Sequence, residues 1–117
     1  MRPARPALAD RTLAAVDRDF HIVQCRAADG ALYFAETERA DAAEAVASIA
    51  AAQIARPERV FAFNPAEGWA RDVSEDIARA VAHKLRAEMS ALTLGQRDFI
   101  EDHCGVNTLI GAADTAA

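Results

Sequence analysis

Hydrophobic positions repeat every two residues in the first part of this chain, which is the period of a half-buried β-strand. The alternation covers Phe20–Cys25 and Ala31–Thr37, and the Asp29-Gly30 pair between them is typical of a hairpin turn. A third apolar run of about 59–63 follows Pro57. We therefore predict three strands, the first two joined as a hairpin.

The same period assigns side chains to the faces of these strands. Phe20, Ile22 and Gln24 share one face of the first strand, and Leu32 and Phe34 share one face of the second. These faces carry the larger apolar side chains. We therefore expect them to pack against the helices.

Between the second and third strands the pattern changes to a helical one. Residues 41–55 place Val46, Ile49 and Ile54 on one side of a helix. Asp41 followed three positions later by Glu44 resembles a capping box. This segment is predicted to be the first helix, ended by Pro57.

Two further helices are predicted after the third strand. Asp72 with Glu75 repeats the cap pattern, and an apolar stripe follows at spacings of four residues: Val73, Ile77, Val81, Leu85 and Met89. Thr93 with Gln96 marks the start of a shorter helix to about Cys104, before Gly105.

The order of elements is therefore β-β-α-β-α-α, an α+β fold in which a small three-stranded, mostly antiparallel sheet is covered on one face by helices. We favour the third strand beside the first, in spatial order 2-1-3; beside the second strand it would be parallel and need a right-handed crossover. Residues 20–110 form the expected single domain. Residues 1–19 are predicted to be a flexible basic tail or a short marginal helix, and 111–117 a frayed tail.

The charge narrows the classes of function. The 117 residues carry a formal net charge of -5, which disfavours direct binding of nucleic acid and suits a basic protein partner. No apolar run is long enough for a membrane span or a secretory signal, so we expect no membrane association and a cytoplasmic location. The 30 Ala and 12 Arg against one Lys indicate a GC-rich bacterial source.

No residue cluster predicts catalysis, a metal site or a cofactor. Cys25 and Cys104 are widely spaced and are expected to be reduced thiols. Asp72, Glu75 and Asp76 are better explained as a solvated helix start than as metal ligands. His103 precedes Cys104 and so points about 100° away from it on a helix, which argues against activation of the thiol. The last helix carries three acidic residues, and their repulsion of phosphate argues against insertion of this helix into a DNA groove.

The turn after the third strand is the candidate binding site. Asn64, Glu67, Trp69 and Arg71 lie together there, and Trp and Arg are the residue types enriched in binding hot spots. A structural interpretation is also open, in which Asn64 and Pro65 form a turn and Trp69 covers the end of the core. The burial of Trp69 distinguishes the two.

The stretch Asn64-Pro-Ala-Glu67-Gly68, followed by Arg71-Asp-Val-Ser-Glu-Asp-Ile77-Ala, resembles a segment of small uncharacterised proteins of GC-rich bacteria and their prophages. The resemblance covers roughly residues 58–80. It implies a self-contained small protein, with a mobile-element origin as an expectation, and it transfers no catalytic residue.

Together these observations favour a small, acidic, non-enzymatic protein-binding or regulatory module. A sharper form is an accessory or inhibitor protein of a phage or mobile element that acts on a host protein or nucleoprotein complex. The open edges of a small sheet also favour a homodimer. The alternatives are a structural homo-oligomeric subunit and a small-ligand-binding domain or enzyme, which would need a concave pocket.

Overall fold

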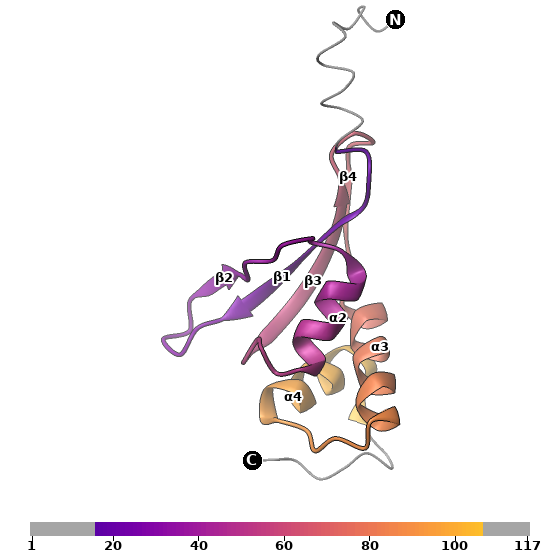
Figure 1. Ribbon diagram of the computed structural model, residues 1–117. Coiled ribbons are helices and arrows are strands. Elements are labelled where there is room, and N and C mark those ends of the chain that lie inside the picture. The colour runs from indigo at the N-terminus through magenta and orange to yellow at the C-terminus, as the bar shows by residue number, and fades with distance from the viewer. Residues whose placement is uncertain (1–15, 107–117) are drawn as a thin grey trace, which may run out of the picture.

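The computed structural model describes residues 16–106. Within this part of the chain a sheet is covered by helices on one side (Figure 1). The strands are β1 (Phe20–Arg26), β2 (Leu32–Phe34), β3 (Pro57–Asn64) and β4 (Trp69–Asp72). The helices are α2 (Ala42–Ala50), α3 (Ser74–Ala87) and α4 (Leu94–Cys104).

The sheet has the order β2-β1-β3-β4, and every neighbouring pair is antiparallel. The α+β class and the placement of the third strand beside the first are therefore confirmed. The prediction of three strands is wrong by one, because residues after Asn64 turn back and pair with β3 as β4. β4 has only four residues, two of them charged, and so carries too short an alternation to be recognised.

The predicted orientations of the first and second strands are wrong, and Leu32 and Phe34 of β2 lie on the face away from the helices. Val23 and Cys25 are the buried residues of β1, whereas Phe20, Ile22 and Gln24 lie on the face away from the helices. The register places Phe61 and Phe63 of β3 and Phe34 of β2 on that same open face, where Phe20 and Phe63 stack with ring centroids 5.4 Å apart. Because both faces of β1 carry apolar side chains, period two alone did not identify the inner one.

The first helix is shorter than predicted. α2 begins as expected after Asp41, whose carboxylate accepts a hydrogen bond from the Glu44 backbone N–H at 2.7 Å. It ends at Ala50 rather than Ala55, because Ala52 turns the chain with a positive φ of 57°. Pro57 is already in β3 and ends no helix.

The two later helices begin in different ways. Asp72 does not cap α3 through a capping box; its Oδ1 accepts from the Ser74 N–H at 2.8 Å, while the residue in the cap position, Val73, makes no side-chain cap. The buried Ser74 hydroxyl instead accepts from the Val60 N–H at 2.8 Å and so joins α3 to β3. Thr93 and Gln96 form the predicted capping box of α4.

One hydrophobic cluster joins the inner face of the sheet to all three helices (Figure 1). Its largest fully buried side chains include Phe99, Ile49 and Leu92. Gly95 of α4 lies so close to the chain after α2 that a Cβ atom there would fall 1.9 Å from the carbonyl oxygen of Ala55. The close approach of these segments therefore requires glycine at this position.

Most of the two predicted tails lies outside the described residues, which exclude 1–15 and 107–117. Residues 16–19 are described and contact the domain, since Arg18 Nη2 donates to the Arg39 carbonyl oxygen at 2.6 Å. The last residues of the predicted tail 1–19 thus belong to the folded unit.

Candidate functional site

The four candidate residues meet on the β3–β4 hairpin, which extends past the end of α2 (Figure 1). Asn64 pairs directly with Trp69 across the hairpin, and the Gly68 N–H donates to the Asn64 carbonyl oxygen at 2.8 Å. Gly68 has a φ of 75°, a backbone angle that favours glycine. The turn predicted from this sequence therefore closes a hairpin rather than leading directly into a helix.

Trp69 is half-buried and packs against the edge of the core. Its indole N–H donates to Glu67 Oε1 at 2.9 Å, and the Arg71 guanidinium carbon lies 5.1 Å from the ring centroid. Glu67 and Arg71 are exposed. We call these three residues the hairpin surface. The indole ring of Trp69 is thus held by a hydrogen bond on one edge and a cation–π contact on one face.

Asn64 has a supporting position in this arrangement. Its side chain is 3% exposed, and its Oδ1 accepts from the Glu67 N–H at 2.9 Å. Its Nδ2 donates toward Asp19 Oδ1 at 3.3 Å and Asp17 Oδ1 at 3.4 Å. Asn64 thus ties the hairpin to the segment before β1, contacts that no local sequence pattern could have revealed.

His21 lies on the same face as Arg71, in a row that runs from β1 through Ala62 to β4. Its Nδ1 is buried and makes no hydrogen bond within the described residues. Burial lowers the pKa of His21, and the positive charge of Arg71 acts in the same direction. The nearby carboxylates of Asp19 and Asp41 raise the pKa but do not outweigh these two effects. This side chain is therefore neutral at pH 7 and supplies no positive charge there.

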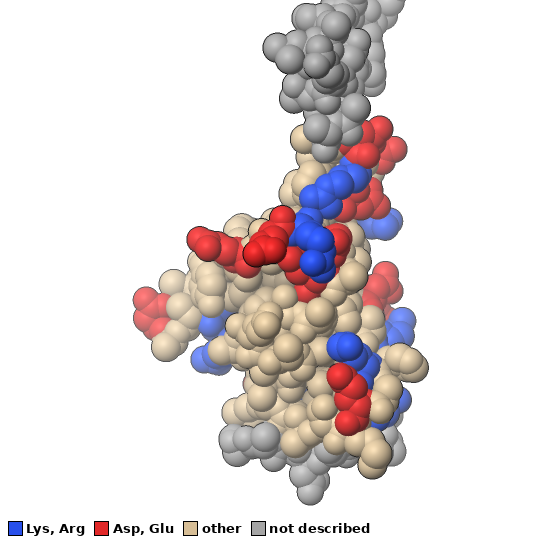
Figure 2. Space-filling view, viewed as in Figure 1, with Lys and Arg blue, Asp and Glu red and all other residues tan. Residues whose placement is uncertain are grey.

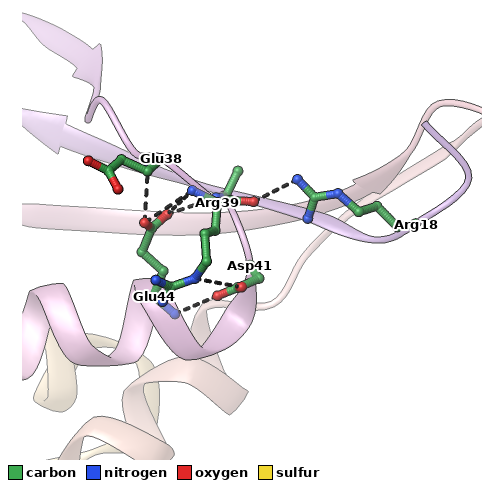
Figure 3. A network of polar contacts seen from close by, with 6 residues as sticks. Arg18, Glu38, Arg39, Asp41 and Glu44 are labelled. Carbon is green, nitrogen blue, oxygen red and sulfur yellow. Dashed lines mark hydrogen bonds and ion pairs between the residues drawn. The ribbon is translucent and has the colours of Figure 1, made fainter. Parts of the chain in front are cut away.

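A polar network holds the loop between β2 and α2 next to this region (Figure 3). Both carboxylate oxygens of Glu44 accept backbone hydrogen bonds, from Ala40 at 2.7 Å, Arg39 at 3.1 Å and Glu38 at 3.2 Å. The Arg39 side chain donates to Asp41 at 3.1 Å. Burial alone would raise the pKa of Glu44. The three backbone N–H donors outweigh this effect and hold the pKa of Glu44 below its usual value.

Charged side chains gather at the end of the sheet that extends past the helices, whereas the surface of α2 is largely uncharged (Figure 2). A shallow apolar groove of about 430 Å³ runs between α2 and α3 and is lined mainly by alanines. An acidic hollow of about 440 Å³ lies beside the loop of Figure 3, lined in part by Glu36 and Glu38. Neither cavity contains a residue of the hairpin surface.

The other titratable residues considered from the sequence have structural contacts. Cys25 and Cys104 form no disulfide within residues 16–106, and burial raises the pKa of each thiol. His103 Nε2 lies 2.7 Å from the Glu58 carbonyl oxygen, and its ring meets Phe99 edge-on at 5.0 Å. His103 is thus a half-buried histidine at the edge of the core.

Two of the acidic residues at the start of α3, Asp72 and Glu75, are likewise paired within the protein. Asp72 pairs with Arg59 at 2.8 Å and Glu75 with Arg79 at 2.7 Å. Among residues 16–106, no group of three or more His, Cys, Asp or Glu residues is placed to hold a metal ion. No helix in that range is long and apolar enough to cross a membrane.

Comparisons with known proteins return no protein-family model, curated protein or solved structure that matches this chain.

Proposed function

We propose that the protein is a non-enzymatic protein-binding module and that the hairpin surface of Glu67, Trp69 and Arg71 contacts the partner. One observation carries this proposal: an indole ring held in a defined orientation at the tip of a hairpin that extends past the helices (Figure 1). Trp and Arg are the residues that most often dominate binding energy in protein interfaces. The hairpin surface places one of each in direct contact.

The contacts around Trp69 favour binding because they reduce the conformational entropy that is lost when the partner binds. Glu67 fixes one edge of the ring at 2.9 Å, and Arg71 covers one face at 5.1 Å. Side chains that are already ordered lose less conformational freedom on association. Trp69 is half-buried and also packs against the core, so its burial does not choose between the two interpretations made from the sequence, as a cover of the core and as a binding anchor.

The charge of the chain favours a basic partner. The net charge is -5, and Asp17, Asp19 and Glu67 lie at the hairpin end of the sheet. Opposite charges across an interface accelerate association and make it sensitive to salt. We therefore infer a basic protein, or the protein component of a nucleoprotein complex, as the partner class. An accessory role for a phage or mobile element is consistent with this class and rests on the sequence resemblance alone.

The test is an affinity capture from an extract of the source organism, read by mass spectrometry. The baits are the wild-type chain, Arg71→Glu, and the double variant Trp69→Ala/Arg71→Ala. We expect one or more partners to be retained by the wild type and lost with both variants. Arg71 is exposed, so its reversal should leave the fold intact, and circular dichroism checks both variants.

The matched control is Arg79→Ala/Leu94→Ala, which removes one exposed Arg and one exposed apolar side chain far from the hairpin. These side chains are 62% and 60% exposed, respectively. The control should retain the partner. A partner that binds all the baits equally, or no partner at all, would contradict the assignment. For a purified partner, the emission of Trp69, the only tryptophan, reports directly on whether the hairpin surface is covered.

A further inference from the structure

The outer edge of β2 is the most apolar exposed segment among the described strands. Leu32, Tyr33 and Phe34 are consecutive and remain 50%, 49% and 53% exposed. We call these three residues the β2 edge. β2 is the outermost strand on its side of the sheet (Figure 1). An exposed apolar edge is a template for pairing with another strand.

The opposite edge differs from it. β4 carries Arg71 and Asp72, and charged side chains are a common means of preventing edge-to-edge pairing. β2 carries no charged residue and no proline. Only its short length limits pairing, so of the two sheet edges β2 is the one suited to accept a strand.

The hydrogen bonds of β2 identify which backbone groups are available. The Ala35 N–H donates to the Val23 carbonyl oxygen at 2.9 Å, and the Ala27 N–H donates to the Ala31 carbonyl oxygen at 2.8 Å. Bonding groups alternate along an antiparallel strand, so Ala31, Tyr33 and Ala35 face β1. The N–H and C=O groups of Leu32 and Phe34 therefore face outward.

We propose that a second copy of this chain occupies the β2 edge, with the two β2 strands antiparallel around a two-fold axis at Tyr33. In this register Leu32 of one copy lies opposite Phe34 of the other, and they exchange both backbone hydrogen bonds, four in all across the axis. Tyr33 lies opposite itself. Two four-stranded sheets would then join into one continuous sheet.

The register follows from the sequence of β2. An axis at Tyr33 places all three exposed apolar side chains opposite one another, and aromatic and aliphatic cross-strand pairs stabilise such ladders. An axis at Leu32 would place Phe34 opposite Gly30, and an axis at Phe34 would place Leu32 opposite Glu36. Both alternatives leave apolar side chains unpaired.

Charge complementarity also favours a second copy. With the axis at Tyr33, Glu36 of one copy lies opposite Gly30 of the other. The carbonyl oxygen of Gly30 is bound by Arg26 Nη1 at 2.8 Å, so a guanidinium group lies beside the approaching carboxylate. Glu36 is exposed, and Arg26 is also paired with Glu58. Each end of the shared ladder thus combines the cation of one copy with the anion of the other.

The area available indicates a weak dimer. Large side chains bury roughly 150–250 Å² each, and about half of each of the three is free, which gives on the order of 200–400 Å² per copy. Stable interfaces bury about 800 Å² per partner. We therefore expect a dissociation constant in the micromolar to millimolar range.

Sedimentation velocity of the purified chain, at about 10 μM to 1 mM, tests the proposal. We expect the average mass to rise from monomer toward dimer. Tyr33→Lys places two like charges on the axis and should raise the dissociation constant at least about tenfold. Arg71→Glu, on the other edge, should leave the dissociation constant unchanged, so failure of this dimer is distinguishable from failure of the hairpin surface. Circular dichroism confirms that each variant is folded.

Cysteine cross-linking tests the register in a chain with Cys25→Ala and Cys104→Ser. Tyr33→Cys should form a covalent dimer under mild oxidation, because directly opposite residues of a non-hydrogen-bonded pair lie within disulfide reach. Ala31→Cys alone should not cross-link, but a mixture of Ala31→Cys and Ala35→Cys chains should.

A chain that stays monomeric at the highest concentration overturns the proposal. So does a dimer that persists unchanged in Tyr33→Lys, or a pattern in which Ala31→Cys cross-links alone. Capture of a strand from a different protein by a monomeric chain would assign the β2 edge to another partner and equally contradict pairing with a second copy.

Discussion

At the scale of single residues, Gln96 is the clearest case of one buried side chain on which two elements depend. Its Nε2 donates to the carbonyl oxygens of Ile49 at 2.9 Å and Ala50 at 3.0 Å, at the end of α2. Its Oε1 accepts from the Thr93 N–H at 2.9 Å. The capping box with Thr93 could be predicted from spacing, but the reach to α2 could not, because it joins residues 46 and 47 positions apart.

Gln96→Glu should destabilise the protein by about 2–4 kcal/mol at pH 7. The substitution replaces a donor by a buried carboxylate that faces two carbonyl oxygens and the negative end of a helix dipole. Its folded pKa would therefore be raised. The loss of stability is greatest above that raised pKa. It diminishes as the pH falls toward 4, because the protonated acid can again donate a hydrogen bond to a carbonyl oxygen at the end of α2.

Urea unfolding of the variant and the wild type, each at pH 7 and near pH 4, measures this difference. Gln53→Glu is the matched control, since Gln53 is exposed and the same change there should cost less than about 0.5 kcal/mol. Equal losses for the two variants would contradict the role assigned to Gln96.

At the scale of elements, the starts of α2 and α4 were predictable from short spacings, whereas the cap of α3 and the faces of the strands were not. Asp41 and Thr93 cap their helices as predicted, because capping involves atoms only three residues apart. The inner face of β1 depends on which side chains fit beneath α2 and α3. Both Phe20 and Val23 satisfy an apolar alternation, so only tertiary packing decides between them.

Glu44→Gln should lower stability at neutral pH more than at acidic pH. The folded pKa of Glu44 lies below its ordinary value, so the carboxylate contributes stability that is fully present above the unfolded pKa and is lost as the pH falls through the folded pKa. The amide retains one acceptor oxygen for the three N–H donors but no charge. We expect the Tm to fall by a few degrees at pH 7 and the difference to disappear near pH 3.

Thermal unfolding across this pH range checks the prediction, with Glu75→Gln as the control. Glu75 is exposed and pairs with Arg79 one turn away, a contact worth little in water. A difference in Tm between Glu44→Gln and the wild type that does not change with pH would contradict the prediction. It would mean that the shape of the Glu44 side chain, rather than its charge, stabilises the fold.

At the scale of the whole molecule, the placement of β3 beside β1 was favoured from the sequence because β3 beside β2 would need a parallel pair and a right-handed crossover, whereas β4 was not predicted. The candidate site was predicted as a cluster of neighbours in sequence, and the hairpin does assemble Asn64, Glu67, Trp69 and Arg71. The open edge at β2 follows from the predicted order 2-1-3. The tie of Asn64 to Asp17 and Asp19 joins residues distant in sequence, and local patterns contain no information on such contacts.

The long central strands also predict how the domain unfolds. β3 runs from the hairpin surface to the region beneath the helices, and Trp69 packs against the same cluster that contains Ile49 and Phe99. Trp69 fluorescence and the far-ultraviolet circular dichroism of the helices should therefore give coincident urea transitions, as in two-state unfolding. Measurements at about 5 μM, at the low end of the expected range of dissociation constants, keep most of the protein monomeric and so limit the effect of association on the curves. A fluorescence transition that precedes the loss of helix would mean that the hairpin opens on its own, and its fixed indole would then be ordered by the partner rather than before binding.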